Sequence, residues 1–231
     1  MQYYRPNNFP PVVKNLIIIN VLVFVAQLTL ENQFHITEKF MLWPVMFDQF
    51  RPYQIFTHMF AHSPQTYFHI LFNMFGLWMF GKILENVWGH KRFLFFYLAC
   101  GLGAAALHML IQYIRYDQIM EQVQAALALG DRASAIKIYS ELGPALGASG
   151  AVMGIFIAFG YLFPNTELYI MFIPVPVKAK WVMIGLVAID LFGGVARVSG
   201  DNVAHFAHLG GALTGFIIVW VWNKTNRKTL Y

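Results

Sequence analysis

Four polar side chains interrupt the apolar stretches of this sequence, and their types suit one kind of chemistry. Ser149 lies in the segment LGASGAVMG (146–154), His208 lies in the last apolar run, and His69 and Asn73 lie together in an earlier one. Burying a polar group in apolar surroundings without a partner costs roughly a few kcal/mol, so each of the four calls for a reason. A serine becomes a useful nucleophile beside a base, and a neutral imidazole is the usual base. Ser149 and His208 are therefore a candidate nucleophile and general base for acyl transfer.

His69 and Asn73 supply the hydrogen-bond donors that acyl transfer needs. They are four residues apart, so on a helix they share one face. Donors aimed at the developing oxyanion stabilise it, and the backbone N–H of Ser149 near a helix start would join them. We expect no acidic residue at this depth on the three apolar runs concerned. The sequence therefore predicts a serine–histidine dyad, not a triad.

Small residues around these groups predict close helix packing. Glycines four residues apart occur in both apolar runs, at Gly150, Gly154, Gly211 and Gly215. Such pairs let the backbones of two membrane helices approach closely. Gly147 and Gly150 also leave room around Ser149. A packing role for Ser149 itself stays open, because a lone serine in a Gly/Ala-rich membrane helix is more often a packing residue than a nucleophile.

Composition places the chain in a membrane. It is 58% hydrophobic and only 12% charged, whereas soluble domains carry about 25% charged residues. A chain this apolar cannot cover its surface for water, which favours a polytopic membrane protein. The single cysteine excludes a disulfide within the chain. The basic residues are scattered between apolar runs instead of forming a patch, which argues against nucleic-acid binding.

Six segments are apolar and long enough to be candidate membrane-spanning helices, so the predicted fold is an all-α bundle of six spans. Their approximate limits are 12–30, 66–84, 93–114, 145–163, 181–196 and 202–222. Ten of the 16 lysines and arginines fall in the segments that share a side with both termini, which predicts cytoplasmic termini by the positive-inside rule. In that topology the second, fourth and sixth spans all begin at the outer face. Ser149, His208, His69 and Asn73 then lie within roughly 10 Å of it.

Two of the outer connections are unusual. Residues 31–65 are too apolar and aromatic for a solvated loop, so we expect them to lie in the membrane interface or on the bundle. Residues 115–141 are rich in charges and have helical spacing with a break at Gly130-Asp131, which predicts a helical hairpin outside the membrane. The whole chain, 1–231, is interpreted as one membrane domain built on the six spans, with 115–141 as an insertion between the third and the fourth.

Other polar residues receive less specific interpretations. His58 and His62 are four apart, but HMFAH lacks the glutamate of a zinc-protease helix, so no metal site is predicted and both are expected to anchor the outer loop. His205 is expected at the rim of the site, with a role in hydrating or orienting it left open. Asp190 is expected to pair with a neighbouring helix in a structural role, because nothing in the sequence places it near Ser149.

Three motifs together resemble the rhomboid family of intramembrane serine proteases over about residues 50–225. They are HILFN (69–73), GASG (147–150) and AHLGG (207–211), which resemble the family's H-x-x-x-N, G-x-S-G and A-H-x-x-G on the second, fourth and sixth spans. The resemblance implies that Ser149 is the nucleophile, His208 the base, and His69 and Asn73 the oxyanion donors. It also implies single-span membrane proteins as substrates, cut near the outer membrane boundary, with no cofactor and no metal.

The sequence departs from the family pattern at several places. Tyr53-Gln54 stand where many bacterial members have Trp-Arg, and Met153 stands where some have a tyrosine that stacks on the catalytic histidine. The insertion 115–141 has no counterpart in the minimal family core, and a role in substrate access is a hypothesis. We expect a multi-pass protein of a prokaryotic plasma membrane. Two alternatives are an inactive relative that binds membrane clients and a small transporter, although no internal repeat supports the latter.

Overall fold

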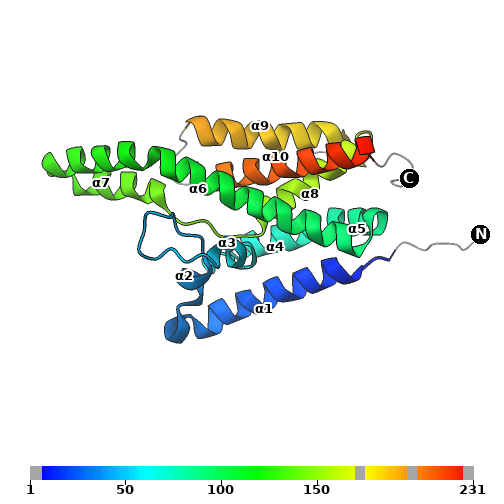
Figure 1. Ribbon diagram of the computed structural model, residues 1–231, viewed down its shortest axis with the longest axis horizontal. Coiled ribbons are helices and arrows are strands. Elements are labelled where there is room, and N and C mark those ends of the chain that lie inside the picture. Colours follow the sequence, from blue (N-terminus) through cyan, green and yellow to red (C-terminus); the bar gives the residue numbers. More distant parts are fainter. Residues whose placement is uncertain (1–6, 170–174, 197–201, 226–231) are drawn as a thin grey trace, which may run out of the picture.

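The computed structural model describes residues 7–169, 175–196 and 202–225 of the chain. Long helices run roughly side by side, and the first helix begins at the same end of the bundle at which the last helix ends (Figure 1). We call this the termini end, and the opposite end the site end. Six helical segments correspond to the expected spans: α1 (Pro11–Phe34), the continuous stretch α4 (Tyr67–Gly76), η2 (Leu77–Gly81) and α5 (Lys82–Trp88), then α6 (His90–Ala128), α8 (Ser149–Leu162), α9 (Ala179–Ala196) and α10 (Asn202–Thr225).

Length and exposure identify four of these helices as candidate membrane spans. Four helices of the described chain are long and apolar enough to cross a membrane: α1, the Tyr67–Trp88 stretch, α6 and the His205–Thr225 part of α10. Large apolar side chains cover their outer faces, as at Phe68, Leu71 and Phe75, which are 65%, 58% and 50% exposed. Apolar surface on this scale belongs in lipid. The predicted fold class, a polytopic helical membrane protein, is confirmed.

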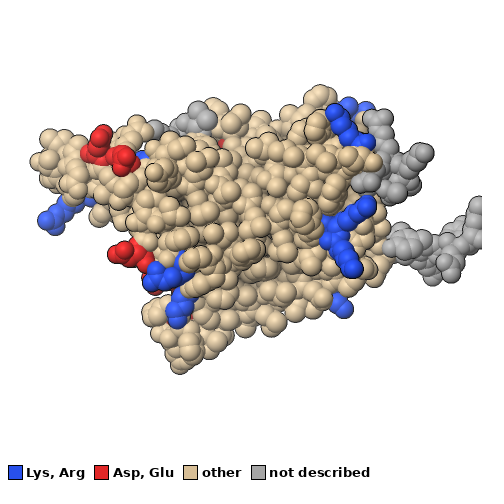
Figure 2. Space-filling model, in the orientation of Figure 1, with Lys and Arg blue, Asp and Glu red and all other residues tan. Residues whose placement is uncertain are grey.

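The face of the molecule that Figure 2 shows has an almost uncharged middle. Lysine and arginine side chains gather near the termini end, both signs of charge occur at the site end, and a largely uncharged band lies between them (Figure 2). Such a band matches the hydrocarbon layer of a bilayer, which excludes charges.

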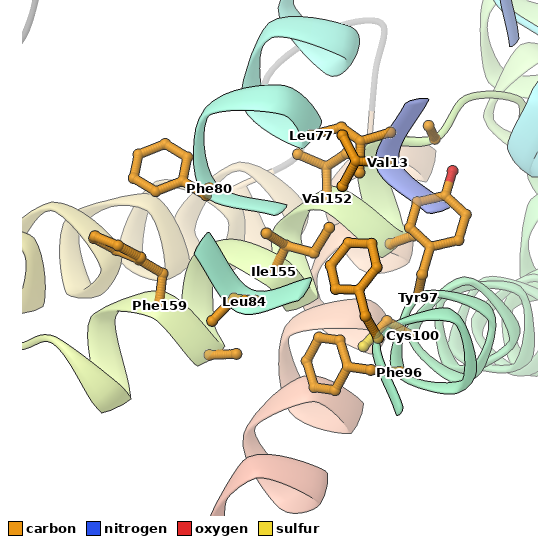
Figure 3. Packing of buried hydrophobic residues seen from close by; sticks show 14 of the residues in the cluster. Val13, Leu77, Phe80, Leu84, Phe96, Tyr97, Cys100, Val152, Ile155 and Phe159 are labelled. Carbon is orange, nitrogen blue, oxygen red and sulfur yellow. The ribbon is translucent and has the colours of Figure 1, made fainter. Parts of the chain in front are cut away.

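Helix α8 is the central element of the bundle. It is only 14 residues long, about 21 Å, and most of its side chains are buried. Val152, Ile155 and Phe159 of α8 pack among apolar side chains of the second and third spans (Figure 3). The helix that begins with Ser149 is therefore surrounded by protein and not by lipid.

The first outer connection folds into short helices that are tied to the bundle. It contains α2 (Ile36–Phe40), α3 (Gln54–Thr57) and η1 (His58–Phe60). Gln54 is buried; its Oε1 accepts from the Arg51 N–H at 3.1 Å and its Nε2 donates to the Gln49 carbonyl at 3.0 Å. Gln54, which stands where many bacterial family members have arginine, thus joins backbone groups of this loop through a neutral side chain.

Residues 115–141 form a helix, a turn and a second helix. The first arm is the C-terminal part of α6, whose 39 residues span about 58 Å, well beyond a hydrocarbon core of about 30 Å. The chain turns at Gly130, with φ +75°, and Asp131 caps α7 (Arg132–Tyr139) by accepting from the Ser134 N–H at 3.0 Å. A turn of η3 (Ser140–Leu142) follows. The predicted position of this hairpin outside the membrane stays a prediction.

A short two-stranded connection precedes α9. The strands β1 (Glu167–Leu168) and β2 (Val177–Lys178) pair antiparallel, with Glu167 opposite Lys178.

Candidate active site

The four chemistry-bearing residues found in the sequence line one cavity. This cavity of about 680 Å³ lies at the site end, and Ser149, His208, His69 and Asn73 are all in its wall. They come from three helices, α4, α8 and α10, that are far apart in the sequence. A smaller cavity of about 310 Å³ also has Ser149, His208 and Asn73 in its wall, together with apolar side chains of α4 and α8.

Ser149 lies at the N-terminus of α8, where helical N–H groups are unpaired. The segment before it is held by the outer loop: the Gly147 N–H donates to the His58 carbonyl at 2.9 Å, and the Ala148 N–H approaches His62 Nε2 at 3.5 Å. The N–H of Ser149 has no partner within the described part of the chain. Because the first N–H groups of a helix also bear partial positive charge, this group suits a developing oxyanion.

His69 directs a donor toward the same space. Its Nδ1 accepts from the Ser63 N–H at 3.3 Å, so a neutral His69 carries its proton on Nε2. A Cβ placed on Gly147 would lie 2.8 Å from that Nε2 and 3.6 Å from Ser149 Oγ. The imidazole donor of His69 and the hydroxyl of Ser149 therefore both lie beside Gly147, whose φ is +127°.

Asn73 lies one helical turn below His69 and is almost completely buried. Its Nδ2 donates one hydrogen to the His69 carbonyl at 2.9 Å, which orients the amide and leaves its second N–H for the cavity. His69, Asn73 and the Ser149 N–H can therefore all donate into one space.

Glycines let the helices that bear Ser149 and His208 touch backbone to backbone. A Cβ on Gly211 would lie 1.9 Å from the Gly150 carbonyl oxygen, and one on Gly215 would lie 2.8 Å from Gly154 Cα. No other residue type permits this approach. The contact brings Ser149 and His208 to the same cavity, although no direct hydrogen bond joins the two side chains in the described part of the chain.

Asp190 is the functional candidate that the sequence argument missed. Its Oδ1 is 3.0 Å from Nδ1 of His208 and 2.8 Å from Nδ1 of His205. Asp190 pairs with a neighbouring helix, as expected, and its partners there include the proposed base, His208. The four residues found in the sequence lie on α4, α8 and α10, whereas Asp190 reaches His208 from α9. His205, expected at the rim, joins the same cluster.

Met153 is 7% exposed and lines the smaller cavity together with His208. It stands where some family members have a tyrosine that stacks on the catalytic histidine. The described contacts give His208 a carboxylate partner in Asp190, so its orientation does not depend on a ring at position 153.

His58 and His62 are buried parts of the outer loop. His58 Nδ1 donates to the Gln54 carbonyl at 3.0 Å, and Gln27 of α1 bonds the backbone of His62 at both its N–H and its carbonyl. Burial lowers the pKa of His58 to about 4. Burial is the larger cause, and the charge of the nearby His69 the smaller one, that together lower the pKa of His62 to about 3. Both imidazoles are neutral at physiological pH.

Acidification is expected to destabilise the outer loop through these two histidines. In the unfolded chain each titrates near 6.5, whereas the folded values are about 4 and 3, so below 6.5 the unfolded state binds more protons. The contribution of these two neutral histidines to the free energy of unfolding is therefore fully present above about pH 6.5. It decreases as the pH falls toward 4, by up to about 1.4 kcal/mol per pH unit for each histidine. Thermal unfolding in detergent across this range checks the slope, which His62→Gln should reduce. A flat pH profile in the original protein would contradict this account.

These features define a class of protein: a polytopic helical membrane protein with a serine, a histidine and converging hydrogen-bond donors around a cavity. The Rhomboid domain model matches residues 49–225. The chain belongs to the rhomboid family.

Three relatives show how far this likeness extends. The chain is 30% identical to Rhomboid protein 1, mitochondrial, of Saccharomyces cerevisiae over 168 residues, which are 73% of this chain and 42% of that protein. It is 32% identical to RHOMBOID-like protein 12, mitochondrial, of Arabidopsis thaliana over 218 residues, 94% of this chain and 59% of that protein. It is 30% identical to human Presenilin-associated rhomboid-like protein, mitochondrial, over 149 residues, 64% of this chain and 32% of that protein. The chain thus spans between a third and three fifths of the length of these relatives.

The relatives correct one expectation. All three are named as mitochondrial proteins, which contradicts the assignment of the chain to a prokaryotic plasma membrane. Composition and charge distribution identify a membrane protein, but they carry no signal that separates one kind of bilayer from another.

Proposed function

We propose that this chain is an intramembrane serine endopeptidase in which Ser149 attacks a peptide carbonyl and His208 is the general base. The observation that carries the proposal is the convergence on one cavity of Ser149, His208 and the donors His69 and Asn73. Membership of a family whose members are generally membrane serine proteases supports it.

The reaction follows from these positions. Ser149 Oγ bonds to the carbonyl carbon while its proton passes to His208 Nε2, and the oxyanion accepts from the Ser149 N–H, His69 and Asn73. The C–N bond then breaks, and the leaving amine takes the proton from His208. Water attacks the acyl-enzyme, gives a proton to His208, and releases the new carboxyl end as Ser149 regains its hydrogen.

The cavity supports the hydrolytic step. At about 30 Å³ per water molecule, its 680 Å³ would hold roughly twenty waters beside Ser149. Hydrolysis within a bilayer needs such a reservoir, because the surrounding lipid supplies none.

The proposed substrates are single-span membrane proteins, cut near the membrane boundary at the site end. A helical segment hides its carbonyl groups in hydrogen bonds, so a substrate must unwind before Ser149 can reach one. Substrates with helix-destabilising residues next to a small residue should therefore be cut fastest.

The test uses the purified chain in detergent and in liposomes with a panel of single-span substrates. Matched pairs should differ only by Gly-Ala or Leu-Leu at the boundary, with cut sites mapped by mass spectrometry. We expect cleavage at the boundary and a clear preference for the Gly-Ala member. Failure to cut any substrate, with client binding retained, would favour the inactive relative instead.

Gly147→Ala is expected to reduce cleavage by about 10²-fold or more. The new Cβ would lie 2.8 Å from His69 Nε2 and would displace this donor, and loss of one oxyanion donor costs about 10²–10³-fold. Gly130→Ala is the matched control, since Gly130 also has positive φ but has nothing within 4 Å of an added Cβ. Equal cleavage rates for both variants would show that His69 is not an oxyanion donor and that Gly147 is not needed to leave room for it.

We further propose a mitochondrial membrane as the place of action, supported by the names of the relatives. Expression of a tagged chain in yeast lacking its own Rhomboid protein 1, followed by fractionation, tests this. Accumulation in another membrane would count against it.

A further inference from the structure

The contact between α9 and α10 contains a cluster that the proposed dyad does not use. Asp190 is 5% exposed, and its Oδ1 lies within hydrogen-bond distance of Nδ1 in both His208 and His205. The two histidine rings are not bonded to each other: their centroids are 6.5 Å apart and their planes are nearly perpendicular. One carboxylate oxygen thus joins two imidazoles that lie one helical turn apart.

A glycine provides the space for this arrangement. A Cβ on Gly193 would lie 2.4 Å from His205 Nε2 and 2.7 Å from two further atoms of that ring. The His205 ring therefore lies flat against the α9 backbone at Gly193. The D-x-x-G spacing of 190–193 on α9 matches the H-x-x-H spacing of 205–208 on α10, because positions three apart share a helix face.

We propose that Asp190 is the positioning residue of a Ser149–His208–Asp190 relay and that His205 is its second anchor. The inference rests on the proposed function and names a member of the site that the sequence motifs do not include. The Nδ1–H of His208 donates to the carboxylate, which leaves the lone pair of His208 on Nε2, the nitrogen that must take the serine proton.

The carboxylate also stabilises the charge that forms during the reaction. When His208 accepts the proton of Ser149 it becomes an imidazolium, and the adjacent carboxylate offsets the cost of that charge. His205 donates to the same oxygen from the other side. It fixes the rotamer of Asp190, so the carboxylate stays aligned with His208 throughout the cycle.

A purely structural helix-to-helix pair would not need this geometry. One histidine would suffice to join α9 to α10, and it would not have to be the proposed general base. The ligand atoms of the three residues also lie within 4.8 Å of one another, so bound metal is the competing interpretation. The experiment below separates the two.

Asp190→Asn is expected to reduce kcat by about 10²–10⁴-fold with little change in KM, because the amide N–H favours the wrong tautomer of His208. Asp190→Glu should regain part of the activity. Leu191→Ala, on the exposed face of α9, is the matched control and should cut normally. His205→Gln should lower kcat by roughly tenfold.

A measurement independent of cleavage keeps the two proposals distinguishable. In the original protein labelled with ¹⁵N-histidine, we expect His208 to carry its proton on Nδ1 at neutral pH, and in Asp190→Asn on Nε2. The expected tautomer in a chain that cuts nothing would support the geometry and reject the proposed function. An unchanged tautomer, or an equal kcat in Asp190→Asn, would overturn the positioning role. Loss of activity in EDTA that Zn²⁺ restores would overturn it in favour of a metal site.

Discussion

Ser149→Ala is expected to lower cleavage by at least about 10³-fold while leaving the fold intact. The hydroxyl is the only part of the side chain that is lost, and Ser149 begins α8 without a side-chain cap bond, so stability should change little. A missing nucleophile, in contrast, removes the covalent step entirely. His208→Ala should be about equally severe, because the serine is then left without its base.

The double variant sharpens this prediction. Residues that act as one unit are strongly non-additive, so Ser149→Ala combined with His208→Ala should be no slower than either single variant. Ser140→Ala is the matched control: Ser140 lines the same cavity, but its hydroxyl donates to the Lys137 carbonyl at 2.7 Å. Rates should be measured on one substrate with thermal stability followed in parallel. Additive losses of activity, or a similar loss in Ser140→Ala, would contradict the claim that Ser149 and His208 act as one catalytic unit.

Gly211→Ala is expected to have the largest effect on stability. Its Cβ would lie 1.9 Å from the Gly150 carbonyl oxygen, which is backbone and cannot rotate away. Helices α8 and α10 must separate to admit the methyl group, and overpacking of this kind costs about 1–3 kcal/mol or more. Because these helices bear Ser149 and His208, cleavage should fall as well.

Gly185→Ala provides the comparison for that result. Gly185 lies in α9 with nothing within 4 Å of an added Cβ, and alanine favours helix over glycine by about 1 kcal/mol. Thermal unfolding in the same detergent should show Gly211→Ala destabilised and Gly185→Ala unchanged or stabilised. Equal destabilisation of both variants would mean that the close backbone contact at Gly211 is not the cause of the stability loss.

The sequence was sufficient for the arrangement of the helices and for the meeting of four polar residues at one cavity, because both depend on hydropathy and depth. The distribution of lysine and arginine predicts the direction in which each span runs. The rise per residue then places Ser149, His208 and His69 at one depth without any tertiary information. Asp190 could not be found in this way. Its partner depends on how α9 rotates against α10, which only packing decides, although the matching D-x-x-G and H-x-x-H spacings were available as a signal.

The start of α8 shows a second limit. The apolar run predicts a helix from about residue 145, but the helix begins at Ser149. In the segment before it, Ala145 is extended and pairs with Leu42 in an isolated antiparallel bridge, and Gly147, with φ +127°, donates its N–H to the outer loop. Those partners lie about a hundred residues away in the sequence, so local pattern cannot reveal them. This segment is what places Ser149, and not an earlier residue, at the helix N-terminus.

The central claim is that Ser149 is an activated nucleophile. Its most direct test is to treat the folded protein with a fluorophosphonate and map the covalent adduct by mass spectrometry. We predict one adduct, on Ser149, that is lost in His208→Ala, greatly slowed in Asp190→Asn and absent from the unfolded chain. An unlabelled Ser149, or labelling that is equal at Ser140 and unaffected by His208→Ala, would contradict the account.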